Sequence, residues 1–220
     1  GESNYRTDNL FLFGSNLGQY EGIFACVGIY SNNHVIQASD PEGPALDGYV
    51  LGGGKLYLEG GDVFNYDPGI GGYQVQPIFG LNDGPDGGSD VTSVEGRTVL
   101  SGLTFAYTGG NSFMDELRPA GGSARMLYTI PGSSTPYDTS AVWHFYGAGR
   151  SIAAVPEFGG LVDDATNKKD TVMARMLRFF RQSVAAPEIT VTPVALAETL
   201  QVAQTGTKTF SISNVTAPPA

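Results

Sequence analysis

Two apolar runs in the first part of the chain decide the predicted fold. Residues 23–27 form a continuous apolar run, which is typical of a strand buried on both faces. Residues 56–58 form a second short run, and the segment between them ends on three glycines at 52–54, as helices often do. Two runs joined by about 25 residues have the length of one right-handed strand–helix–strand unit. The pattern therefore predicts an α/β domain with a doubly wound, mostly parallel sheet.

The rest of the chain continues with β-type patterns and one strong helix. Four later segments alternate between apolar and polar residues, as strands do: 94–107, 124–130, 141–146 and 151–155. Residues 147–150, Gly-Ala-Gly-Arg, suit a hairpin turn between the last two. We expect one helical turn over residues 113–117. Apolar residues spaced three and four apart predict an amphipathic helix over about residues 167–182.

The composition changes after residue 183, which indicates a domain boundary. We assign residues 1–183 to the α/β domain and residues 184–187 to a linker. Residues 188–220 are rich in Thr and Val, with the alternation of an incomplete β-sandwich module. Since there is no room before residue 10 for the first strand and helix of a doubly wound domain, we expect that part to be missing or to lie on another chain.

Charge and cysteine content narrow the classes of partner. The net charge of −10 argues against nucleic acid and anionic membrane surfaces, because both need basic clusters. No apolar stretch approaches the roughly 20 residues of a membrane-spanning helix, so we expect no membrane insertion. The chain opens without a signal pattern, and we expect any export signal to have been removed or never included. Cys26 is the only cysteine, which rules out an intrachain disulfide framework.

Three motifs in order resemble a known family. They are YEGIFACVGIYSNNH at residues 20–34, LEGGD at 58–62 and EFGGL at 157–161. Together they resemble the class I glutamine-amidotransferase-like (flavodoxin-like) domain of large secreted multi-domain bacterial proteins. The tail is similar to the immunoglobulin-like modules that follow such domains. The resemblance implies an extracellular or cell-surface setting and contacts with other domains of the same polypeptide.

The residue at the predicted nucleophile position argues against amidotransfer. Class I amidotransferases carry a cysteine in the sharp turn after a central strand, and here Glu59 occupies that turn. A carboxylate cannot perform thiolate acyl transfer. The only thiol, Cys26, lies in an apolar run, where we expect a buried and inert side chain.

Polar residues at the ends of the predicted parallel strands form the candidate site. Ligands of doubly wound sheets bind at the carboxyl ends of the strands. There, Glu59, Asp62 and Glu157, with His34, could act as acids and bases or hold a hard cation, while Asn32 and Asn33 could bind a ligand. The alternative, which we favour from the sequence, is that Glu59 and Asp62 only cap backbone N–H groups of nearby turns.

Other motifs give little support for a cofactor. Two histidines and one cysteine provide no zinc spacing. Asp83, Asp86 and Asp90 could hold Ca²⁺ but lack the loop pattern of a calcium site, so a solvated loop is expected. Several aromatic side chains lie near predicted loops and strand ends, where they suit contact with a glycan or a protein partner: Tyr30, Tyr66, Tyr73, Tyr107, Tyr137 and Trp143.

Two functional hypotheses follow from these residues. The first, which the sequence favours, is a non-catalytic structural or binding module of a secreted, multi-domain bacterial protein. The second is a hydrolase-type enzyme that uses the carboxylate cluster with His34, with or without a metal. The two differ in whether the carboxylates meet in one site or are occupied separately by backbone N–H groups.

Overall fold

The computed structural model describes residues 9–11, 16–87, 91–110, 113–131 and 139–182, together with two strands near the C-terminus. The chain divides into two compact units, Gly1–Phe180 and Arg181–Ala220, and each is considered by itself. The first unit is built around one eight-stranded sheet. Among the described residues, no helix combines the length and the apolar character needed to cross a bilayer.

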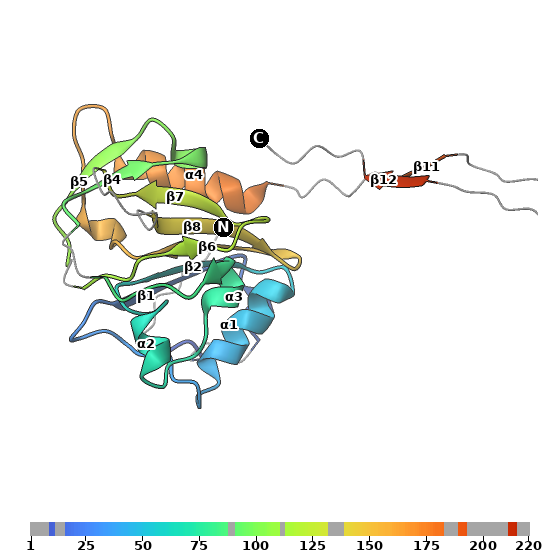
Figure 1. Cartoon of the computed structure of the whole chain (residues 1–220), viewed down its shortest axis with the longest axis horizontal. Coiled ribbons are helices and arrows are strands. Elements are labelled where there is room, and N and C mark those ends of the chain that lie inside the picture. The colour runs from blue at the N-terminus through green and yellow to red at the C-terminus, as the bar shows by residue number, and fades with distance from the viewer. Residues whose placement is uncertain are drawn as a thin grey trace, which may run out of the picture. The chain divides into compact units, whose positions relative to one another are not determined.

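The strands of the large sheet are only partly in chain order (Figure 1). From one edge to the other they are β1 (Ile23–Gly28), β2 (Lys55–Gly60), β9 (Gly149–Ala154), β8 (Thr139–Tyr146), β7 (Arg125–Thr129), β4 (Ser93–Gly96), β5 (Thr104–Tyr107) and β10 (Leu161–Val162). A separate two-stranded sheet pairs β3 (Leu81–Asn82) with β6 (Arg118–Pro119). The most buried strands, β2 and β9, lie next to each other near one edge.

The predicted strand–helix–strand unit is confirmed. β1 and β2 pair in parallel, and α1 (Glu42–Leu51) connects them. The glycines after α1 end the helix, because the N–H groups of Gly52, Gly53 and Gly54 turn back onto carbonyls of its last turns. β9 adds to β2, again in parallel. These three strands place their carboxyl ends at one edge of the sheet.

The prediction of a doubly wound, mostly parallel sheet is wrong. Only β1, β2 and β9 run parallel, and every further pairing in the eight-stranded sheet is antiparallel. The cause is local: β8 and β9 form a hairpin whose turn contains Gly147 at φ 57°, so β8 must return antiparallel to β9. The mixed sheet follows from the hairpin at residues 147–150.

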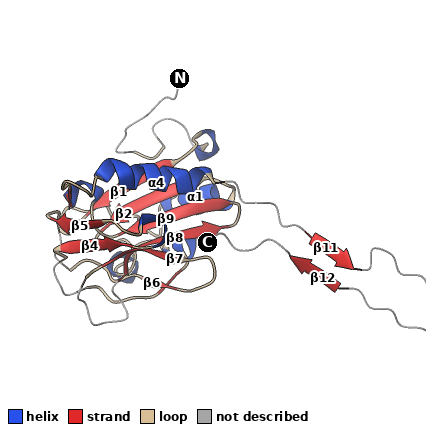
Figure 2. Ribbon diagram, turned by 90° about the horizontal axis from the view of Figure 1, so that it is seen from above, coloured by secondary structure: helices blue, strands red, loops and turns tan. Residues whose placement is uncertain are grey.

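Helices cover the two faces of the sheet (Figures 1 and 2). On one face, Phe179 of α4 (Lys169–Arg181) packs against the rings of Trp143 and Phe145 of β8. On the other face, α3 (Gln76–Phe79) docks through the carbonyl of Ile78, which accepts hydrogen bonds from Ser151 Oγ at 2.6 Å and from His144 Nδ1 at 3.0 Å. The predicted amphipathic helix near residues 167–182 is thus confirmed as α4.

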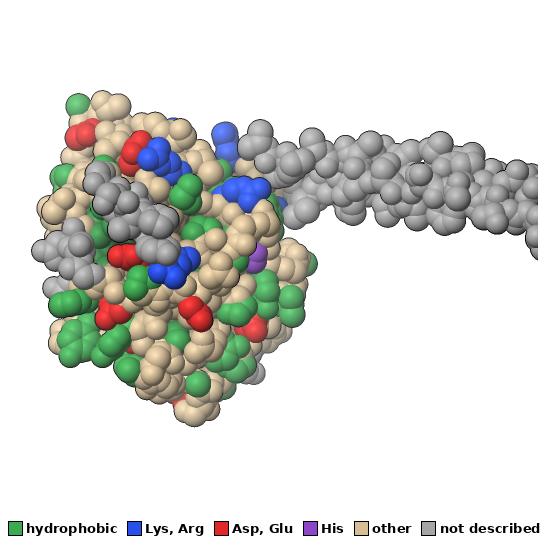
Figure 3. Space-filling view, viewed as in Figure 1, with side chains coloured by type: hydrophobic (Ala, Val, Ile, Leu, Met, Phe, Trp, Pro, Cys, Tyr) green, Lys and Arg blue, Asp and Glu red, His purple; other side chains and the backbone are tan. Residues whose placement is uncertain are grey.

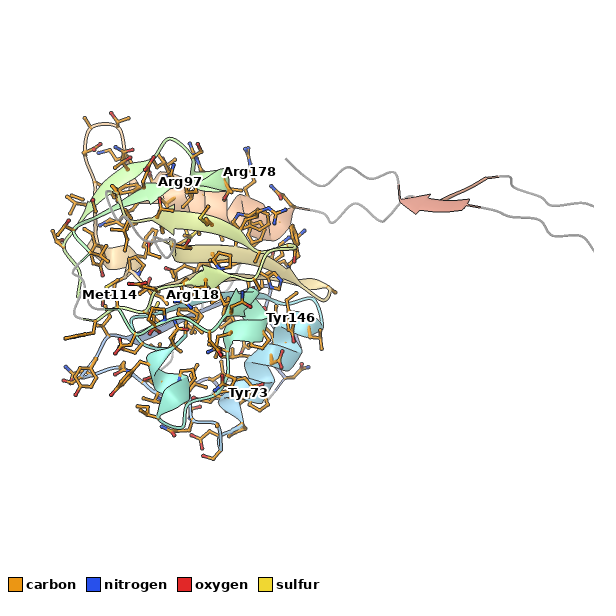
Figure 4. The ribbon with its side chains drawn as sticks, viewed as in Figure 1. Tyr73, Arg97, Met114, Arg118, Tyr146 and Arg178 are labelled. Atoms are coloured by element: carbon orange, nitrogen blue, oxygen red, sulfur yellow. The ribbon has the colours of Figure 1, made fainter. Side chains whose placement is uncertain are left out.

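The connecting segments contain short helical turns. These are η1 (Leu17–Gln19), α2 (Tyr66–Gly69), η2 (Thr98–Leu100) and η3 (Phe158–Gly160). The helical turn predicted over residues 113–117 is wrong, because the structure has no helix there. Asp47 of α1 accepts a hydrogen bond from Tyr73 Oη at 3.3 Å and lies close to Tyr146, and Figure 4 shows these tyrosines beside α1 and α3.

The second unit consists of one described strand pair. β11 (Ile189–Thr192) and β12 (Ser211–Asn214) pair antiparallel, with Ile189 opposite Asn214. The described residues of this unit form one strand pair and no sandwich. The prediction of the beginning of an immunoglobulin-like module is therefore wrong for the described residues.

Candidate functional site

One row of side chains crosses the sheet near the carboxyl ends of its parallel strands. Cross-strand register aligns Cys26 with Glu59, Glu59 with Ala154, Ala154 with Ala141, and Ala141 with Tyr128. Directly paired residues point to the same face of a sheet. Glu59 therefore has the Cys26 thiol on one side. On its other side lie two alanines, whose small side chains leave it room.

Glu59 is a buried carboxyl held by mixed donors. Its Oε2 accepts hydrogen bonds from Tyr57 Oη at 2.6 Å and from the Phe158 backbone N–H at 2.7 Å. The side chain is only 7% exposed, and this burial raises the pKa of Glu59 above its ordinary value, while the hydrogen bonds act in the opposite direction. The negative charge of Glu157 raises the pKa further. These conditions favour a carboxyl that keeps its proton at higher pH.

Glu157 directly precedes η3. The next residue, Phe158, is the one whose backbone N–H binds Glu59. Glu157 Oε2 accepts a hydrogen bond from the Gly110 N–H at 2.9 Å. Tyr107 Oη accepts from the Glu157 N–H at 3.1 Å and donates to the Gly110 carbonyl at 2.7 Å. A Cβ at Gly109 would lie 2.8 Å from Glu157 Oε2, so a larger residue there would force the carboxylate to shift. We call Glu59 and Glu157 the acid pair.

The prediction that Cys26 is buried is wrong. β1 is the edge strand of the sheet, and its thiol is exposed beside Glu59. Partial desolvation, with the nearby Glu59 carboxylate, raises the pKa of Cys26 to about 11. Since only the thiolate is a good nucleophile, the thiol stays protonated and unreactive at neutral pH.

A second set of polar residues ties together the loops after β1 and β2. Asp62 Oδ2 accepts the backbone N–H of Tyr30 at 3.0 Å. Asn33 Nδ2 donates to both carboxylate oxygens of Asp67, at 3.2 and 3.3 Å. Both aspartates are 2% exposed. Burial and then the charge of Asp62 raise the pKa of Asp67 to about 6. Asp62 thus joins this loop network.

Asp115 is a buried acid that sequence reasoning missed. It accepts three successive backbone N–H groups, from Phe64 at 2.9 Å, Asn65 at 2.9 Å and Tyr66 at 3.1 Å. Its side chain is 3% exposed, and burial raises its pKa to about 8 against the effect of these hydrogen bonds. A signal existed in the sequence, because residues 113–117 carry this acid beside apolar neighbours.

His34 and Asn32 lie outside the acid pair. His34 Nε2 lies 2.7 Å from Glu42 Oε2 at the start of α1, and the histidine side chain is 59% exposed. The structure brings His34 toward Asp67, whose pKa it lowers, and gives no contact between His34 and Glu59. Asn32 is exposed, and its backbone N–H bonds the Ile29 carbonyl at 3.2 Å. The predicted site residues therefore separate into two groups: the acid pair, and the residues of the loops after β1 and β2.

The described residues provide no metal-ligand set. No group of three or more His, Cys, Asp or Glu side chains among them is arranged to hold a metal ion. Asp83 and Asp86 are exposed, and Asp90 lies outside the described residues. The Ca²⁺ candidate of residues 82–90 stays a prediction.

A cavity of about 700 Å³ lies at the opposite end of the parallel strands. It is lined by η1, the C-terminal turn of α1 and the start of β2, with Tyr20, Tyr49 and Lys55 among its residues. The N–H groups of the glycine run at its floor are already bonded within the helix end, so they are not free to bind an anion. None of the predicted site residues lines this cavity.

Comparison with solved structures finds glycoside hydrolases among the similar folds. Gan42B, a GH42 β-galactosidase from G. stearothermophilus, is 14% identical, with a TM-score of 0.50 over 79% of this chain and 23% of that enzyme. A β-galactosidase from Rahnella sp. R3 is 14% identical over 76% of this chain and 24% of its own, with a TM-score of 0.47. A cytoplasmic protein from Salmonella typhimurium is 15% identical over 74% and 73%, with a TM-score of 0.49.

These comparisons correct the family assignment. No protein-family model and no curated protein matches the chain. The similar solved structures above are β-galactosidases and a cytoplasmic protein, and at this identity the likeness to Gan42B concerns the fold alone. The resemblance to glutamine-amidotransferase-like domains is therefore wrong, as is the immunoglobulin-like assignment of the tail. The chain spans about a quarter of the length of the β-galactosidases that it matches.

Proposed function

We propose that this chain is a domain of a carbohydrate-active hydrolase and that the acid pair carries its chemistry. The observation that supports the proposal is the buried Glu59, whose pKa is raised, beside Glu157 at the carboxyl ends of parallel strands. Two carboxyl groups in different environments are the general solution for glycoside hydrolysis. The β-galactosidase likeness makes a galactoside the first substrate class to test.

The different surroundings of the two carboxyl groups assign their roles. Glu59, whose raised pKa favours the protonated carboxyl, would donate its proton to the glycosidic oxygen as the bond from that oxygen to the sugar carbon breaks. Glu157, half-buried and bonded to one backbone N–H, would take a proton from the water that attacks the carbon. One water is consumed: the leaving oxygen gains the proton of Glu59, and Glu157 gains a proton from the water. Proton exchange with solvent then restores both carboxyl groups. Asp62 and His34 have no part in this step.

The test is hydrolysis of 4-nitrophenyl β-galactoside and 4-nitrophenyl β-mannoside by the purified chain. We expect Glu59→Gln and Glu157→Gln each to lower the rate at least about 100-fold, as loss of a general acid or base does. Glu95→Gln, which removes an exposed carboxylate paired with Arg97, serves as the matched control. Unchanged rates in both variants of the acid pair, with unchanged melting temperatures, would overturn the proposal.

A second candidate function is a non-catalytic structural or binding module beside other domains of the same polypeptide. The observation that favours it is that Glu59, Asp62 and Glu157 each accept a backbone N–H group, as structural caps do. On this view no aryl glycoside is hydrolysed above background, and Glu59→Gln changes only the melting temperature. A setting outside the cell remains part of this proposal.

A further inference from the structure

Tyr30 presents an aromatic ring to solvent at the end of β1. Its side chain is 63% exposed, among the highest values of the large apolar and aromatic residues described. The ring meets Tyr66 edge-on, with centroids 6.3 Å apart and planes at 81°. An edge-to-face neighbour supports one side of a ring and leaves a face free for another contact.

Buried anchors fix the position of this aromatic pair. The backbone N–H of Tyr30 is held by Asp62, and that of Tyr66 is held by Asp115. Both acids are 3% exposed or less, so the loops that carry the two rings are fastened to the interior of the domain. A binding surface that is already ordered before the ligand arrives loses less entropy on binding.

Tyr30 directly follows a residue that packs close to the acid pair. Ile29, the residue before Tyr30, packs against Gly110, because a Cβ at Gly110 would lie 3.1 Å from Ile29 Cδ1. The same Cβ would lie 3.7 Å from Glu157 Oε2, and the Gly110 N–H is the donor to that oxygen. Figure 3 shows apolar side chains gathered on the side of the molecule where Figure 1 places β1 and α2.

The chemistry around Tyr30 selects an uncharged ligand with both apolar and hydroxyl faces. The net charge of −10 and the Asp62 carboxylate at the Tyr30 N–H disfavour anions such as phosphates. The exposed Asn32, two residues further along the chain, offers an amide group. A pyranose ring has this combination: its C–H face suits an aromatic face, and its hydroxyls suit amides and carboxylates.

We infer that Tyr30 is the sugar-stacking subsite of this domain and holds a hexose ring of a β-galactoside or β-mannoside beside the acid pair. This inference rests on the proposed function. It assigns Tyr30 the role of binding residue, with Tyr66 as the residue that positions its ring.

The experiment is a titration of the chain with methyl β-D-galactopyranoside and methyl β-D-mannopyranoside, followed by ¹H–¹⁵N chemical shifts. We expect Tyr30→Ala and Tyr30→Leu to weaken binding at least about tenfold, because both lose the flat face, while Tyr30→Phe keeps most of the affinity. Leu51→Ala, which trims a side chain 52% exposed at the far end of α1, is the matched control and should bind as the parent chain does. Equal affinities of the parent chain and Tyr30→Ala would overturn the inference, as would no binding of either sugar.

The inference and the proposed function fail in different ways. If Glu59→Gln binds sugar normally through Tyr30 and the parent chain hydrolyses no aryl glycoside, the hydrolase proposal fails and the subsite stands. If the parent chain hydrolyses aryl glycosides and Tyr30→Ala leaves KM unchanged, the subsite fails and the acid pair stands. A true subsite raises KM in Tyr30→Ala more than it lowers kcat.

Discussion

Glu59 and Asp115 are both buried acids with raised pKa values, but they are held differently. Asp115 receives three backbone N–H groups from one continuous segment, residues 64–66. Glu59 receives one backbone N–H and one tyrosine hydroxyl, and it faces a second acid and an exposed thiol. The first arrangement fixes a loop, since every donor belongs to the backbone of that loop. The second arrangement leaves the pKa of the Glu59 carboxyl dependent on the side chains around it.

The contrast shows how to separate an architectural acid from a reactive one in this domain. Burial alone does not distinguish them, because Glu59 is 7% exposed and Asp115 is 3% exposed. The identity of the hydrogen-bond donors distinguishes them. Removing an acid that holds several backbone N–H groups destabilises the fold, whereas changing a side-chain donor shifts the pKa of the acid. The following predictions test this difference.

The largest expected effect is on stability in Asp115→Ala. The change leaves three buried backbone N–H groups without an acceptor, and we expect the free energy of unfolding to fall by about 3 kcal/mol. Urea unfolding followed by circular dichroism measures it. Asp83→Ala, at an exposed aspartate of the neighbouring loop, should change the free energy by less than about 0.5 kcal/mol. Equal stabilities of the two variants would show that the Asp115 cradle does not hold the loop.

The pH dependence of stability tests the same cradle. The pKa of Asp115 is raised to about 8 and that of Asp67 to about 6, so the folded chain binds more protons than the unfolded chain above pH 4. The stability that this gives is complete at low pH and is lost as the pH rises through 6 and then 8. We expect the urea midpoint to fall between pH 5 and pH 8.5, and to fall less in Asp115→Asn.

The opposite pH result has a defined meaning. If the midpoint of the parent chain rises over this range, Asp115 is ionised in the folded state, and its three N–H donors outweigh its burial. A slope that is identical in Asp115→Asn and the parent chain would assign the dependence to Asp67 or other groups. Either outcome would weaken the parallel between Asp115 and Glu59.

The part of this fold that the sequence predicts correctly is the part encoded locally. The β1–α1–β2 unit follows from two apolar runs and a glycine stop, and α4 follows from its apolar spacing. The prediction of a parallel sheet extended this local unit to the whole domain. The turn around Gly147 already predicted a hairpin, and a hairpin forces antiparallel pairing, so the information was present but given too little weight.

The candidate site was predictable only as a region. Strand ends predicted that Glu59, Asp62 and Glu157 lie at one edge, yet the loops divide them into the acid pair and the Asp62 network. Asp115 joins that edge across about 50 residues of chain, a contact that no periodic pattern reports. The exposure of Cys26 depends on β1 being an edge strand, which is a property of the whole sheet order.

Tyr57→Phe tests whether a side-chain donor sets the pKa of Glu59. The tyrosine hydroxyl lowers the pKa of Glu59 by donating to its carboxylate, so its removal should raise that pKa further. We expect a stability loss of about 1 kcal/mol, the usual value for one hydrogen bond. The ¹³C shift of the Glu59 carboxyl against pH measures the first effect. Tyr146→Phe, near Asp47 on the other face of the sheet, is the control; a Glu59 titration that is unchanged by Tyr57→Phe would contradict the role of this donor.

The smallest expected effect concerns Tyr128, at the far end of the row that contains Glu59. Its hydroxyl is buried and has no hydrogen-bond partner among the described residues, while the ring is 2% exposed. Because a buried unpaired hydroxyl opposes folding, Tyr128→Phe should keep the free energy of unfolding or raise it by up to about 1 kcal/mol. Tyr57→Phe, two residues before Glu59 on the same strand, is the matched comparison with the opposite sign. A clear loss of stability in Tyr128→Phe would show that its hydroxyl is bonded in solution, and would make it a further partner in the environment of Glu59.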